Sequence, residues 1–227
     1  MKKIMFSDRY GLTDAVLSGR KTMTRRIVLP IEVDWNGRGR MTLPVSGFMH
    51  GLLWMDCSEF LPGSGLFDYV APQKYQPRYG KGEVVAVAQS YKDCWDIYQR
   101  RWKAKKSPSD WHTPDAILGD QADTVKGWSN KMFVRADLMP HHISITDLLF
   151  ERLQDISDED CLKEGVEKWM DCYIVSGIME RGGKSNVCFD TPREAFAALI
   201  DRISGRGTWK SNPWVVAYEF ELIRKEG

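Results

Sequence analysis

Residues 19–26 gather several reactive groups in one short stretch. They read Gly-Arg-Lys-Thr-Met-Thr-Arg-Arg and supply a primary amine, two hydroxyls and guanidinium groups. Such groups bind polar or anionic ligands, and an amine whose pKa is lowered by burial or by neighbouring cations can also accept a proton. The candidate ligand-binding residues here are Arg20, Thr22, Arg25 and Arg26. The alternative is a solvated basic edge strand, whose charges protect it against aggregation.

The elements around this stretch determine whether its side chains converge. Apolar residues at helical spacing, followed by a glycine, predict a helix over about residues 9–18. A strand with one polar face is predicted over residues 21–28. On a regular strand Lys21 and Thr24 point to opposite faces, so their convergence requires the turn to extend past Lys21 or the strand to bulge. Thr22 then supplies either a structural or a functional hydroxyl.

Two later helices have clear signals at their ends. Ser157 is a predicted N-cap followed by three acidic residues, which places Glu164 at the C-terminal end of a short helix. Thr191 caps the last helix, a proline takes its first position, and apolar residues share one face as far as Gly205.

Three other segments have the pattern of strands. Residues 84–88 form a short apolar run typical of a buried strand. Residues 142–152 also read as a strand, although three consecutive apolar residues at 148–150 break the alternation and indicate a β-bulge. Residues 214–222 alternate apolar with acidic positions, which predicts a half-buried strand.

The mixed order of few strands and short helices predicts the fold class. It favours a single α+β domain over residues 1–227, built as a compact sheet or small β-barrel rather than a doubly wound fold. Two large insertions, at about 30–80 and 93–128, are rich in turn residues or polar residues. The first contains candidate short strands at 41–43 and 52–55.

Four sequence blocks, in this order, resemble the ASCH domain, and most of all the larger phage-associated ASCH proteins. They are the Gly-Arg-Lys-Thr-Met-Thr-Arg segment at 19–25, the Gly-x-Gly-Glu-Val turn at 80–84, the Leu-Gln-Asp-Ile-Ser block that leads to Glu164-Gly165, and the Gly-Arg-Gly-Thr-Trp and Asn-Pro-Trp pair between 205 and 214. The order of the blocks is more specific than any one of them.

The resemblance implies a PUA-like barrel with short flanking helices and a role with RNA or modified nucleosides. In small bacterial ASCH members that hydrolyse N4-acetylcytidine, the Gly-Arg-Lys-x-x-Thr motif supplies a catalytic lysine and threonine, and a later glutamate completes the site. Lys21 and Thr24 match that motif, and Glu164 is the best match for the glutamate, with Glu159 or Glu167 as alternatives. Three functions stay open: RNA or nucleoside binding, amidohydrolysis of an acylated cytidine, and a protein-interaction role for the insertions.

A second basic segment and a tryptophan offer further contacts with nucleic acid. Phosphate contacts and a stacking ring are available from Arg100, Arg101, Trp102 and Lys103. The alternative is a solvated helix face with one anchoring aromatic side chain. Trp209 could likewise stack on a base, although half-buried tryptophans more often pack in the core.

Composition excludes several classes of protein. The net charge is +1, so attraction to a polyanion requires a local patch. The five cysteines form no CxxC pair, which argues against a disulfide framework, and we expect a cytoplasmic protein without a membrane span. The adjacent histidines at 141–142 point to opposite strand faces, and no nucleotide-binding or serine-hydrolase motif occurs. We therefore expect neither a metal nor a cofactor.

Overall fold

The computed structural model describes residues 1–28, 31–34, 40–43, 45–49, 52–55, 73–74, 77–105, 125–183 and 185–223. For the strands between 31 and 74, and for residues 98 and 100–105, the description covers the backbone only.

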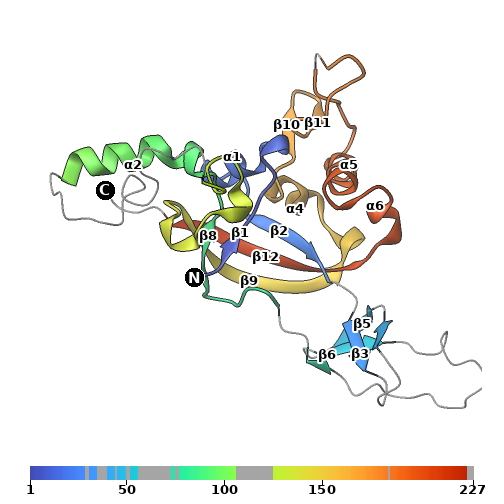
Figure 1. Ribbon diagram of the computed structural model, residues 1–227. Helices are drawn as coiled ribbons and strands as arrows, with labels where there is room; N and C mark the ends of the chain where they lie inside the picture. The colour runs from blue at the N-terminus through green and yellow to red at the C-terminus, as the bar shows by residue number, and fades with distance from the viewer. Residues whose placement is uncertain are drawn as a thin grey trace, which may run out of the picture.

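The main sheet has five strands in the order β1-β8-β9-β12-β2 (Figure 1). These strands are β1 (Lys3–Ile4), β8 (Val84–Val87), β9 (His142–Arg152), β12 (Trp214–Ile223) and β2 (Met23–Ile27). β1 pairs with β8 in parallel, and the other neighbours are antiparallel. The described pairings leave the sheet open between β1 and β2. The combination of helices with a mostly antiparallel sheet confirms the expected α+β class.

Short helices flank the sheet. They are the 3-10 helices η1 (Asp8–Tyr10), η3 (Lys131–Phe133), η4 (Ala136–Leu138) and η5 (Leu153–Asp155), and the α-helices α1 (Leu12–Leu17), α2 (Tyr91–Lys105), α4 (Asp158–Lys163), α5 (Pro192–Ser204) and α6 (Thr208–Ser211). The predicted caps hold: the side chain of Ser157 accepts from the amide of Asp160, and that of Thr191 accepts from the amide of Glu194.

The first insertion contributes strands that pair with one another. They are β3 (Ile31–Asp34), β4 (Arg40–Leu43), β5 (Val45–Met49), β6 (Leu52–Met55) and β7 (Gln73–Lys74). β3 pairs with β4, while β5, β6 and β7 form a three-stranded sheet. The two short strands expected at 41–43 and 52–55 correspond to β4 and β6.

The β-bulge lies earlier in β9 than its sequence suggests. Residues 148–150 pair in regular register with β12, and the register shifts where Asp147 faces Glu219 but Ile145 faces Phe220. Thr146 is therefore the extra residue. The consecutive apolar residues need no bulge, because Leu149 is simply exposed on the outer face.

The hydrophobic core forms where α1 and α5 pack on the sheet. Val85, Ile143 and Val215 of the central strands are fully buried, together with Phe196 of α5 and Val16 of α1. The apolar face expected for the last helix is thus the face that packs inward. Within the described residues, no helix is long and apolar enough to cross a membrane.

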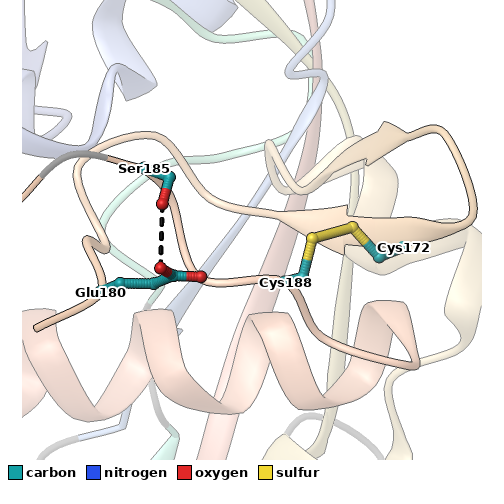
Figure 2. The surroundings of a disulfide bond; sticks show 4 residues. All are labelled: Cys172, Glu180, Ser185 and Cys188. Carbon is teal, nitrogen blue, oxygen red and sulfur yellow. Dashed lines mark hydrogen bonds between the residues drawn. A yellow bond between two sulfur atoms is a disulfide. The ribbon is translucent and has the colours of Figure 1, made fainter.

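A disulfide ties a small hairpin to the segment before α5. The hairpin is β10 (Glu167–Trp169) with β11 (Cys172–Ile174), and Cys172 of β11 is bonded to Cys188 (Figure 2). Backbone hydrogen bonds between Tyr173 and Phe189 bring the two segments together. The sequence did not predict this bond, because only the pairing of the two segments brings Cys172 and Cys188 together.

Candidate functional site

A turn after α1 places Lys21 outside the strand. Gly19 adopts a left-handed conformation with φ of 79°, and the amide of Lys21 donates to the carbonyl of Ala15 at 2.9 Å. β2 then begins only at Met23. The turn therefore extends past Lys21, which is the condition needed for Lys21 and Thr24 to face the same cavity.

The ammonium of Lys21 has three acceptors. Its Nζ donates to the Met23 carbonyl at 2.7 Å, and to both the backbone carbonyl and the Oε2 of Glu164 at 2.6 Å. The side chains of Lys21 and Glu164 are only 1% and 5% exposed. Because an ammonium has three N–H groups, these contacts use all of them.

Helix α4 positions Glu164, which is its C-terminal cap. Gly165 follows with φ of +105°, and a Cβ there would lie 3.0 Å from the Leu12 side chain and 3.7 Å from the Lys21 stem. A glycine is thus required for the chain to turn so close to α1. Of the alternative glutamates, Glu159 pairs with Lys163, and Glu167 pairs with Arg20, so Glu164 is the one in contact with Lys21.

Burial and the ion pair act on Lys21 in opposite directions. Burial lowers the pKa of Lys21 below its ordinary value, because the charged form loses its hydration. The charge of Glu164 and its hydrogen bond oppose this effect, while Arg26 and Arg25 add to it. Burial dominates, so the pKa of Lys21 is lowered overall.

Arg25 of β2 joins three carboxylates. It contacts Glu151 at 2.7 Å, Asp160 at 3.1 Å and Glu164 at 3.3 Å. These partners raise the pKa of Arg25 against the cost of burial, which is the largest single influence on it. Arg25 therefore links β9 and α4 to β2 and fixes the carboxylate that Lys21 also uses.

Lys21, Thr24 and Glu164 line one cavity of about 860 Å³. Thr24 lies beside Tyr218 in the sheet register and is 5% exposed. Among the described residues its hydroxyl has no hydrogen-bond partner, and it is not bonded to Lys21. The cavity volume lies within the range of typical small-molecule sites.

Apolar side chains make up much of the rest of the cavity lining. The C-terminal half of α5 supplies Leu199, Ile200 and Ile203, and the rings of Phe6 and Tyr79 also line the cavity. The Lys21 Nζ lies 5.8 Å from the centre of the Phe6 ring. Sequence reasoning missed this apolar lining. The apolar face of α5 was visible, but nothing in the sequence indicated which partner it would face.

The other predicted ligand residues lie in different places. Arg26 lines the cavity, whereas Arg20 pairs with Glu167 at 2.6 Å and Thr22 uses its backbone groups to bond Lys163 and Phe220. Trp209 packs edge-on against Phe196, with ring centres 6.1 Å apart, outside the cavity lining.

The basic segment of the second insertion falls within α2. Residues 100–103 are helical, and their side chains lie outside the described residues. In the part of the chain that the structure describes, no group of three or more histidine, cysteine or acidic side chains is arranged to hold a metal.

Comparisons with protein-family models, with curated proteins and with solved structures found no match to this chain. The chemistry of the cavity is consequently derived from its own residues.

Proposed function

We propose that the cavity binds a base of RNA or a modified nucleoside. The observation that carries this proposal is that Lys21, Thr24 and Glu164 line one cavity, in which the Thr24 hydroxyl makes no hydrogen bond with the described residues. A hydroxyl that lines a cavity without a protein partner can both donate a hydrogen bond to a ligand and accept one from it. A base offers both donors and acceptors at its edge.

The walls of the cavity suit a flat ring. Tyr79 and Tyr218 meet edge to face with ring centres 5.4 Å apart, and Phe6 lies near both Lys21 and Arg26. Apolar residues of α5 also line the cavity. Aromatic and apolar side chains around a few polar groups are the usual means of holding a base that is out of its stack.

The contacts of Lys21 favour binding over hydrolysis. A lysine that acts as a general base needs a free lone pair close to the hydroxyl it activates. The Lys21 amine instead donates to Met23 and twice to Glu164. These three hydrogen bonds hold the Lys21 amine in place, so it forms a fixed, polar part of the cavity lining.

A second candidate function is removal of an acyl group from a modified cytidine. Two observations favour it. Burial lowers the pKa of Lys21, which favours the neutral amine that can accept a proton, and Lys21, Thr24 and Glu164 line one cavity. In this mechanism Lys21 accepts the proton of Thr24 as Thr24 attacks the acyl carbon, the bond from that carbon to N4 breaks, and the departing cytidine amine takes the proton back from Lys21. Water then hydrolyses the acyl-threonine ester, which releases the carboxylic acid and restores Thr24. Glu164 would orient the Lys21 amine.

Membership of the ASCH domain and completion of the sheet into a PUA-like barrel belong to the same proposal. The support is the resemblance of the sequence blocks together with the five-stranded sheet, whose edge strand β2 carries Thr24. A cytoplasmic location fits a protein that binds RNA, and it is proposed on the same basis.

Titration calorimetry with cytidine, N4-acetylcytidine and a short single-stranded RNA tests the binding proposal. Replacing Thr24→Val keeps the shape and removes the hydroxyl, so the affinity for the bound ligand should fall by about 1–3 kcal/mol. Thr22→Val is the matched control, because that residue does not line the cavity, and it should bind like the parent. If no ligand binds, or if Thr24→Val binds as the parent does, the proposal is wrong.

A further inference from the structure

The cavity carries a marked excess of positive charge. Among the described residues that line it there are five cations, Lys3, Lys21, Arg25, Arg26 and Arg78, and one carboxylate, that of Glu164. The whole chain has a net charge of only +1. The imbalance is thus local, and it points to the charge of what the cavity receives.

Two of these cations are neutralised by carboxylates. Lys21 pairs with Glu164, and Arg25 contacts Glu164 together with Glu151 and Asp160. Their charges therefore serve the structure of the site and leave little attraction for a ligand.

Arg26 has no such partner. Its Nη2 donates to the carbonyl of Met5 at 2.7 Å, and its guanidinium lies 5.9 Å from the centre of the Phe6 ring. Within the described residues no carboxylate lies at ion-pair distance from it. The guanidinium of Arg26 has five N–H donors, and within the described residues the bond to Met5 leaves others for a ligand.

Arg78 adds a second cation of the same kind. Its guanidinium lies 5.7 Å from the centre of the Tyr79 ring, and it too lacks a carboxylate partner in the described part of the chain. Burial lowers the pKa of Arg26 most, Tyr79 and Glu164 oppose this effect, and the charge of Arg78 lowers the pKa further. An anion bound to both Arg26 and Arg78 would offset the repulsion between their positive charges.

We propose that Arg26 and Arg78 form a phosphate-binding site at this cavity, so that its ligand is a nucleotide rather than a neutral nucleoside. This inference rests on the proposed function, and it adds the anionic group that the ligand must carry. In this arrangement the apolar residues of α5 and the Thr24 hydroxyl contact the base of the nucleotide, while the two guanidinium groups bind the phosphate of the nucleotide. Arginine is suited to this task because its planar donors match phosphate oxygens.

The phosphate could belong to a free nucleotide or to an RNA strand, and the assay separates the two. Calorimetry at low salt compares cytidine, cytidine 5′-monophosphate, a short single-stranded RNA and inorganic phosphate, each with the full chain. The monophosphate should bind about tenfold or more tightly than cytidine, since charge-assisted hydrogen bonds are strong. A further gain for the oligonucleotide assigns the phosphate to an RNA strand, and equal or weaker binding assigns it to a free nucleotide.

Arg26→Gln and Arg78→Gln should each reduce the preference for the phosphorylated ligand over cytidine by about fivefold or more. Two matched controls each remove a positive charge at a residue that does not line the cavity. They are Arg20→Gln, near Arg26 in the sequence, and Lys81→Gln, near Arg78. Both controls should keep the preference.

Failure of this inference differs from failure of the proposed function. If cytidine binds as tightly as its monophosphate, the cavity binds nucleosides and the phosphate site is wrong. If neither base-bearing ligand binds while inorganic phosphate binds in a manner that depends on Arg26 and Arg78, the phosphate site stands and the proposed function is wrong. If the variant that combines Arg26→Gln with Arg78→Gln retains the full preference, or if nothing binds, the phosphate site is overturned.

Discussion

Lys21 contacts Glu164 twice, through the backbone carbonyl and through the carboxylate, with both oxygens 2.6 Å from its Nζ. The two residues are 143 positions apart and nearly inaccessible to solvent. The double contact fixes the end of α4 against the turn that precedes β2. Folding and the shape of the cavity therefore depend on the same pair of residues.

Removing one partner of this pair should be costly. Glu164→Gln keeps the shape but leaves the buried ammonium of Lys21 without its counter-charge, so we expect a loss of about 3–5 kcal/mol in the free energy of unfolding. Urea denaturation measures it. Glu159→Gln is the control, because Glu159 is exposed and its pair with Lys163 should contribute less than about 1 kcal/mol.

A double variant tests whether the two charges act as a unit. Lys21→Met combined with Glu164→Gln removes both charges, so its loss in stability should be clearly smaller than the sum of the two single losses. Additive losses would contradict the interpretation of the contact as a coupled buried pair.

Arg25 should resist even a conservative replacement. Arg25→Lys keeps the charge, but a single ammonium cannot contact Glu151, Asp160 and Glu164 in the geometry of a guanidinium. We expect a loss of about 2–4 kcal/mol in the free energy of unfolding, measured by urea denaturation. Arg20→Lys, at an exposed pair with Glu167, should change stability by less than about 1 kcal/mol.

Alkaline pH should destabilise the protein through Cys161. Burial raises the pKa of this thiol from 9.0 to about 12. The folded chain thus keeps a proton that the unfolded chain loses, so stability falls as the pH rises from about 9 to 12, by at most about 1.4 kcal/mol per pH unit from this group. Cys161→Ala should flatten that dependence in denaturation curves measured across the window. An unchanged slope would show that other groups control it.

Local signals predicted much of the fold. The caps at Ser157 and Thr191, and the apolar run that becomes β8, act within a few residues, and each lies where expected. The motif at Lys21 and Thr24 also led to the cavity, because the glycine turn extends past Lys21.

Long-range pairings were beyond the sequence. Arg25 contacts carboxylates that lie 126 to 139 positions away, and no local pattern distinguishes it from Arg26, which lines the cavity without one. The same holds for the bond between Cys172 and Cys188, and for the cavity that α5 and Phe6 line together. Such partners are selected by the packing of the whole sheet.

The last prediction separates hydrolysis from binding at the cavity. If the protein deacylates N4-acetylcytidine, Lys21→Ala and Thr24→Ala should each abolish most turnover, and the double variant should be scarcely worse than either, because a base and its nucleophile act together. The assay measures the acetate that the purified protein releases from N4-acetylcytidine. If the cavity only binds, no variant changes a rate, while Thr24→Ala weakens binding by about 1–3 kcal/mol. Turnover that survives in the double variant would remove Lys21 and Thr24 from any catalytic role.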